Sequence, residues 1–159
     1  MKAASSDMKA ASWPPGIHYV DEANLAIAFF TGVTRGGDAP LMYEKRAQSW
    51  QGRSWNEVAN SVRRLASVLV DAGVSAGDRV MISAENRPEW AIADLAIMAI
   101  GAIVVPAHVT TTEDDHYFIM DHSGASAVIT SGGLLGARIA LAASRAPGLH
   151  LMILMDDDA

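Results

Sequence analysis

The chain has 159 residues, a length that suits one ordinary domain with a core of its own. Half of its residues are hydrophobic, 19% are charged, and the net charge is −6. This acidic balance excludes a nucleic-acid binder of the usual kind, because no cluster of Lys and Arg offers the positive surface that phosphates require. The absence of cysteine excludes disulfide frameworks and thiolate metal sites, and it suits a cytoplasmic protein.

The N-terminal residues carry the sequence Met-Lys-Ala-Ala-Ser twice, at 1–5 and 8–12. They lack an apolar stretch long enough for a signal peptide. We therefore expect residues 1–23 to form a disordered leader and residues 24–159 to form the domain.

Asn24 opens the first predicted helix, because its side chain can cap residues 25–30. We expect this helix to end near Gly32, since residues 35–40 are rich in turn formers. A modest β-hairpin is expected next, with strands over residues 41–46 and 49–54 and a turn near Gln51-Gly52.

Ser54 begins the clearest helix of the sequence. Glu57 lies three residues on, so the hydroxyl and the carboxylate can each satisfy a free backbone N–H group. Apolar residues then recur at helical spacing and predict one buried stripe: Val58, Val62, Leu65, Ala66 and Leu69. Gly73 provides the left-handed residue at which such a helix ends.

Beyond Gly77-Asp78, short apolar runs alternate with helix-like stretches, as in parallel β-α-β units. The expected strands are 79–83, 102–106, 127–130 and 149–155, and the expected helices are 88–100, 113–122 and 134–145. The strands do not alternate cleanly, which predicts burial on both faces. Right-handed crossovers then give an α/β fold, a doubly wound and mostly parallel sheet with helices on both faces, preceded by the short helix and hairpin.

The helix expected over residues 88–100 is apolar on almost every side, with Asp94 as the exception. We expect one of its sides to face chain outside this sequence, so that the protein binds an apolar dye or self-associates. A membrane span is not expected. The uncharged run 95–109 has 15 residues, whereas a bilayer needs about 20, and Gly101 and Pro106 would break the helix.

Doubly wound sheets bind ligands beyond the carboxyl ends of their strands, which directs attention to the loops 84–87, 107–112 and 131–133. Helix capping is the favoured role of Thr110, Thr112 and Ser131 in these loops. The glycine-rich stretch 131–136 could present N–H groups to an anion, but it matches no phosphate-loop spacing and has no Lys nearby. A plain turn is therefore favoured.

His116 and His122 are six residues apart and lie on different faces of a helix, so they are not a metal-binding pair. His108 is the better functional candidate, although a packing role is favoured over that of a catalytic base. We interpret the acidic run 113–115 as a favourable partner of the helix dipole, and the acidic run 156–158 as a solvated loop. The residues predict no metal site and no catalytic centre.

Three motifs occur in order: Gly77-Asp78-Arg79-Val80, Glu85-Asn86-Arg87-Pro88-Glu89-Trp90 and Gly101-Ala102-Ile103-Val104-Val105-Pro106. Together they resemble the AMP-forming long-chain fatty-acyl-CoA synthetases of the adenylate-forming superfamily. Ser54-Trp55-Asn56-Glu57 and Asp121-His122-Ser123-Gly124-Ala125 resemble further segments of that family, so the similarity runs from about residue 24 to the end.

The resemblance implies an ATP-dependent ligase that acts on a fatty acid or another carboxylic acid. ATP and the acid give an acyl-adenylate and pyrophosphate, and the thiol of CoA then displaces AMP. Mg²⁺ assists the first step by neutralising phosphate charge. In some superfamily members the equivalent of the 107–112 loop approaches the CoA nucleotide, which makes His108 and Thr110 candidates for the CoA side.

The family's phosphate loop, nucleotide contacts and catalytic lysine would follow position 159. We therefore expect this chain to be the N-terminal part of the AMP-binding domain and to be inactive alone, in the cytoplasm or at a membrane surface. The alternative is a non-catalytic, flavodoxin-like binding module that keeps the sheet.

Overall fold

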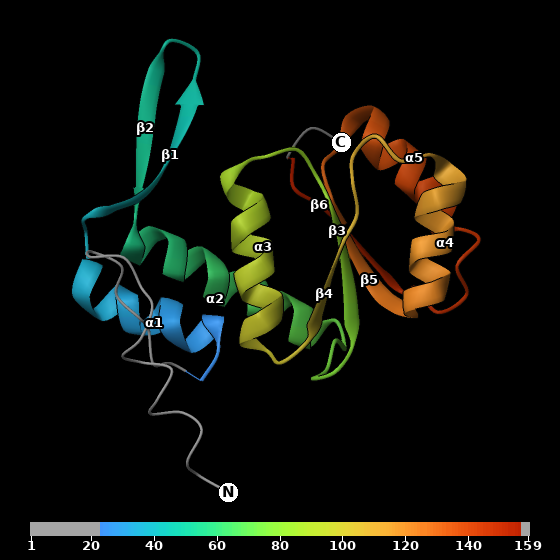
Figure 1. The fold of residues 1–159 in the computed structure, drawn as a ribbon, viewed down its shortest axis with the longest axis horizontal. Coiled ribbons are helices and arrows are strands. Elements are labelled where there is room, and N and C mark those ends of the chain that lie inside the picture. The colour runs from blue at the N-terminus through green and yellow to red at the C-terminus, as the bar shows by residue number, and fades with distance from the viewer. Residues whose placement is uncertain (1–22, 157–159) are drawn as a thin grey trace, which may run out of the picture.

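A computed structural model describes residues 23–156 of the chain (Figure 1). Apart from Ala23, the expected leader lies outside the described residues. The helices are α1 (Leu25–Gly36), α2 (Trp55–Asp71), α3 (Pro88–Ala99), α4 (Glu113–Ser123) and α5 (Gly133–Ala143). The strands are β1 (Pro40–Arg46), β2 (Ser49–Ser54), β3 (Arg79–Ser83), β4 (Ile103–Pro106), β5 (Ala125–Thr130) and β6 (Leu151–Leu154).

Four parallel strands form one sheet in the order β4-β3-β5-β6. Helices α1, α2 and α3 lie on one side of this sheet and α4 and α5 on the other, while β1 and β2 form a separate antiparallel hairpin (Figure 1). This arrangement confirms the predicted doubly wound α/β fold. Its strand order places β3 and β5 side by side in the middle.

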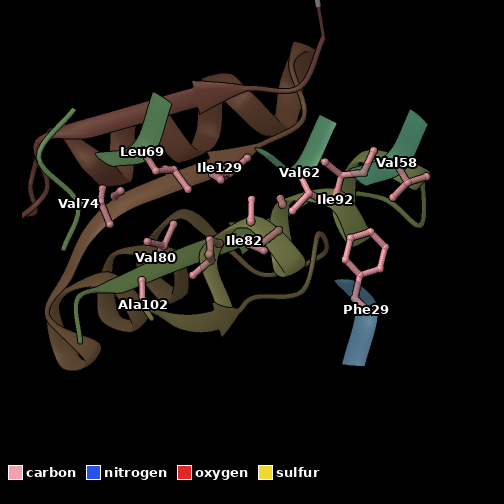
Figure 2. Packing of buried hydrophobic residues seen from close by; sticks show 14 of the residues in the cluster. Phe29, Val58, Val62, Leu69, Val74, Val80, Ile82, Ile92, Ala102 and Ile129 are labelled. Carbon is pink, nitrogen blue, oxygen red and sulfur yellow. The ribbon is translucent and has the colours of Figure 1, made fainter. Parts of the chain in front are cut away.

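The central strands divide the core into two layers, because successive side chains of a strand point to opposite faces. Val80 and Ile82 pack with Val62 and Leu69 of α2 (Figure 2). Met81 points the other way, into the cluster beneath α4 and α5. The prediction of strands buried on both faces holds for β3 and β5 but is wrong for β4 and β6, which form the sheet's edges and are half-buried to exposed.

Helix α1 continues to Gly36, so the predicted end near Gly32 is wrong. Both glycines serve the packing of Trp55. A Cβ atom at Gly32 would lie 2.6 Å from Cζ3 of Trp55, and one at Gly36 would lie 2.2 Å from Cδ1. The indole ring also stacks on Phe29, with 5.9 Å between ring centroids. The glycines therefore make room for an aromatic ring and do not break the helix, which ends at Gly36 and is capped by Gly37 with φ 50°.

The hairpin strands occur close to where they are expected, but the predicted turn near Gln51-Gly52 is wrong. Ala47 and Gln48 form the turn, and Ala47 takes a positive φ of 52°. Gly52 lies within β2, opposite Tyr43, and a Cβ there would come within 3.2 Å of that ring. Here too the glycine serves a close contact across strands.

Helix α2 begins with the predicted capping box. The Ser54 hydroxyl accepts from the Glu57 N–H at 3.2 Å, and the Glu57 carboxylate accepts from the Ser54 N–H at 2.7 Å. The predicted stripe faces the core, with Leu65 and Ala66 at its half-buried margin. Gly73 has φ 93° just past the helix end, as expected.

Helix α3 buries one side within the described residues, while Trp90, Leu95 and Met98 stay half-buried, so the expectation that one side faces chain outside this sequence stays a prediction. The helix packs against α1, α2 and the sheet strands β3 and β4 (Figure 1). Ile92, Ala93, Ala96 and Ile97 are buried. Burial raises the pKa of the Asp94 carboxyl. Across the described part of the chain, no helix combines the length and apolar character needed to cross a membrane.

Candidate functional site

The loops at the carboxyl ends of the parallel strands meet at one edge of the sheet. Chain connections from β3 and β5 leave toward opposite sides, so the switch point of the fold lies between these two strands. The sequence predicted the loops 84–87, 107–112 and 131–133 as the informative ones. The structure adds residues 155–156 after β6.

The switch point is filled by the protein's own side chains. The hydroxyl of Ser131 donates to the Glu85 carboxylate, and this bond is the main reason that the pKa of Glu85 is lowered. Ser131 is therefore not the cap of α5. That position belongs to Gly132, which has no side chain, so the predicted capping role of Ser131 is wrong.

Asp156 occupies the place where an external anion could approach α5. Its carboxylate accepts from the backbone N–H of Gly132 at 2.7 Å and pairs with Arg87. These two contacts, the Gly132 bond first, lower the pKa of Asp156. Residues 133–136 already belong to α5, so the plain turn favoured over 131–136 is wrong for these four residues. Asp156 lies in a loop as expected, but its carboxylate is paired and its side chain is only 32% exposed.

Arg87 also connects the switch point to the hairpin. Its Nε donates to Glu89 at 2.9 Å, and Glu89 accepts from Arg53 of β2 at 2.6 Å. Arg53 in turn lies 3.7 Å from Glu44 of β1. A chain of alternating charges thus joins the carboxyl edge of the sheet to the hairpin.

An open pocket of about 610 Å³ lies beside the switch point, between the loops after β3 and β4. Its apolar wall includes Trp90, Pro106 and Ala107. Its polar side chains are Glu85, Asn86 and His108. The mostly apolar lining with a few polar groups is typical of a small-molecule subsite.

His108 lines this pocket and bonds to Thr110 two residues on. Nδ1 of His108 is 2.8 Å from the Thr110 hydroxyl oxygen and accepts from the Thr110 backbone N–H at 3.3 Å. Since both bonds use Nδ1, Nε2 is the ring nitrogen left for a ligand. Thr110 therefore does not cap α4. Thr112 does, in a capping box with Asp115, so the predicted capping role is confirmed for Thr112 and wrong for Thr110.

His116 supports the same loop from below, a role that the sequence reasoning missed. Its Nε2 lies 2.7 Å from the Thr111 hydroxyl oxygen and 3.3 Å from that of Ser83. The Thr111 hydroxyl donates to the His108 carbonyl at 2.7 Å, so it accepts from Nε2–H of His116. Burial lowers the pKa of His116, which keeps the ring neutral. Its spacing of four from the buried Met120 was the available signal.

Residues 23–156 contain no group of three or more His, Asp, Glu or Cys side chains that could hold a metal ion. His116 is buried, whereas His122 is exposed and stacks on Phe118, with 5.3 Å between ring centroids. The two histidines are separate, as their spacing predicted.

Comparison with known proteins agrees with the fold and the motifs. The AMP-binding enzyme family matches residues 29–159. The long-chain-fatty-acid–CoA ligase FadD15 of Mycobacterium tuberculosis is 41% identical over 76 residues, which are 48% of this chain and 13% of the ligase. Long-chain-fatty-acid–CoA ligase 6 of Rattus norvegicus is 32% identical over 150 residues, or 89% of this chain and 22% of the ligase.

Solved structures share the fold. The N-terminal domain of FACL13 from Mycobacterium tuberculosis superposes with a TM-score of 0.75 at 20% identity, covering 85% of this chain and 34% of that one. A fatty acyl CoA synthetase from the same organism superposes with a TM-score of 0.74 at 20% identity, covering 84% of this chain and 26% of that one. The chain spans about an eighth to a fifth of the curated ligases named above. It therefore belongs to the AMP-binding enzyme family and corresponds to an N-terminal portion of the fatty-acyl-CoA ligases.

Proposed function

We propose that the chain is the N-terminal part of an ATP-dependent acyl-CoA synthetase. The complete enzyme converts a fatty acid and ATP into an acyl-adenylate and pyrophosphate, and then exchanges AMP for the thiol of CoA. The observation that supports this most strongly is the family match over residues 29–159, which includes the whole doubly wound sheet. Fatty acid, ATP and CoA are the substrates of the complete enzyme.

Residues 23–156 act as a scaffold in this proposal. The side chains at the switch point are paired with one another, and the open pocket contains polar groups without a nucleophile held by a base. We expect residues 1–159 alone to give no fatty-acid-dependent exchange of pyrophosphate into ATP. Robust exchange by the purified chain would overturn the assignment of a scaffold role.

His108 and Thr110 are proposed to contact CoA in the complete enzyme. Support comes from the place of His108 in the pocket lining and from its bonds to Thr110, which use Nδ1 and leave Nε2 for a ligand. In the enzyme encoded by the full reading frame, His108→Ala should raise the KM for CoA while leaving adenylate formation without CoA unchanged. An unchanged KM for CoA, or an equal loss in both steps, would remove this role.

We further propose that Mg²⁺ assists adenylate formation through phosphate oxygens and ligands outside this chain. It would neutralise the charge that develops on the transferred phosphoryl group. A cytoplasmic location with contact to membrane surfaces fits a substrate that partitions into lipid. Cell fractionation that places the protein in a sealed secretory compartment would contradict this location.

The alternative of a flavodoxin-like binding module has weaker support. Such modules bind their ligand at the switch point, where Glu85, Ser131, Arg87 and Asp156 already pair with one another. The reading frame distinguishes the two. A continuation past Ala159 into a Gly-rich phosphate loop supports the synthetase, and a natural stop codon there supports the module.

A further inference from the structure

An open apolar groove lies between helices α1 and α3, on the side of the protein away from the candidate site. Its volume is about 630 Å³, and its lining includes Ala26, Ile27, Phe30, Thr31, Met98 and Ala99. No charged side chain contributes to this lining. At the start of α1, Ile27 is 44% exposed and Leu25 is 68% exposed. Helix α1 therefore presents apolar surface that nothing among the described residues covers.

The Phe30 ring in the groove is held in place by its neighbours. The Phe30 ring lies edge-on to Phe29, with 5.1 Å between centroids, and the guanidinium of Arg63 lies 5.1 Å from the Phe30 ring centre. Phe30 and Met98 are only half-buried, although the residues beneath them belong to the main core. A preformed apolar surface of this kind binds an apolar segment at little cost in reorganisation.

The sequence directly before α1 has the composition to cover this surface. Residues 13–20 read Trp-Pro-Pro-Gly-Ile-His-Tyr-Val, and none of them carries a formal charge. Trp13, Ile17, Tyr19 and Val20 supply large apolar side chains, and two prolines favour an extended conformation. The preceding repeat, 1–12, contains no aromatic or branched aliphatic residue.

We propose that residues 13–20 pack along the groove between α1 and α3. Leu25 follows Val20 by five positions, and an extended chain of that length reaches roughly 17 Å. Eight residues in a polyproline conformation span roughly 25 Å, which suits a groove along a helix of roughly 18 Å. The leader would then be limited to residues 1–12. This docking is independent of the proposed enzymatic function.

Cross-linking in the full chain tests the docking, and the absence of native cysteine makes the test clean. Ile17→Cys is combined with Ala99→Cys, because Ala99 is exposed and lines the groove. A short bismaleimide, which tolerates a shift of one residue in register, should link the pair within one chain. A second pair, Ile17→Cys with Ser144→Cys at the end of α5, controls for random encounters, because α5 lies on the far side of the sheet from α1 (Figure 1).

A matched variant separates docking from simple tethering. Trp13→Ser and Tyr19→Ser, added to the Ile17→Cys and Ala99→Cys chain, keep the tether length and remove two apolar side chains. Docking predicts that intramolecular cross-linking slows at least about tenfold, because the effective concentration of the introduced N-terminal thiol near the groove falls. An unchanged rate would mean that the segment is a free tether. Intermolecular dimers that increase with concentration would instead assign the groove to a second copy of the chain.

Discussion

Replacing Gly36 with alanine tests the account of the α1–α2 contact. A Cβ atom at this position would lie 2.2 Å from Cδ1 and 2.4 Å from Cγ of Trp55, far inside normal contact. These atoms are at the base of the indole, so the ring cannot swing clear without moving Trp55 itself. Overpacking of this kind costs about 1–3 kcal/mol, and the gain in helix propensity from Gly to Ala offsets at most about 1 kcal/mol.

We therefore expect Gly36→Ala to lower the free energy of unfolding by roughly 1–2 kcal/mol, or the Tm by about 2–8 °C for a chain of this size. Thermal denaturation followed by circular dichroism measures this change. Gly148→Ala is the matched control, since a Cβ there would meet nothing closer than 4.0 Å, and its effect should stay within about 0.5 kcal/mol.

The Trp55→Leu background provides the decisive comparison. With the indole removed, Gly36→Ala should become neutral or slightly stabilising, so the two substitutions should couple by more than about 0.5 kcal/mol. A Gly36→Ala chain as stable as the wild type, or additive effects of the two substitutions, would refute the reasoning.

Three further predictions concern the loops of the candidate site. Thr112→Ala removes the cap of α4 and should cost about 1 kcal/mol in urea denaturation, whereas no loss would mean that the cap is dispensable. His116 has a lowered pKa in the fold, so the unfolded chain binds its proton more readily and stability should fall as the pH drops below about 6.5. His116→Gln should weaken this dependence of the unfolding free energy on pH, and His122→Gln should not. If both variants lose stability equally steeply as the pH falls, His116 is not buried as a neutral ring. The pKa of Asp156 is lowered in the fold, so its ionised carboxylate stabilises the fold above the unfolded pKa of about 3.9, and this stability is lost on acidification. Arg87→Gln should therefore destabilise the chain more at about pH 7 than near pH 3. A constant difference between the two pH values would count against the Arg87–Asp156 pair.

Much of the architecture was predictable from local pattern. The alternation of apolar runs and helices indicated the parallel sheet, and the capping box at Ser54 placed the start of α2 to within a residue. Both features depend on residues a few positions apart, so the sequence displays them directly. The loops that form the candidate site followed from the same pattern.

The errors at glycine have one physical cause. Local rules treat Gly32, Gly36 and Gly52 as breakers or turn formers, whereas each is placed against an aromatic ring from another element. The rings belong to Trp55 and Tyr43, whose positions depend on the fold. A glycine that serves tertiary contact cannot be told from one that ends a helix until the partner is known.

The pairings at the site were hidden for a similar reason. Glu85 and Ser131 are 46 residues apart, and Arg87 and Asp156 are 69 residues apart. Nothing local indicates that these side chains meet, because strand order alone brings their loops together. Ser131 in particular matched the pattern of a helix cap and instead bonds to the Glu85 carboxylate.

We propose that this chain belongs to an enzyme that forms an acyl-adenylate and that the chemistry requires residues outside 1–159. The most direct test is fatty-acid-dependent exchange of pyrophosphate into ATP without CoA, measured side by side for residues 1–159 and for the product of the full reading frame. The account predicts exchange by the full product and none by residues 1–159. Exchange by residues 1–159 alone, or a full product that exchanges nothing with any fatty acid, would contradict it.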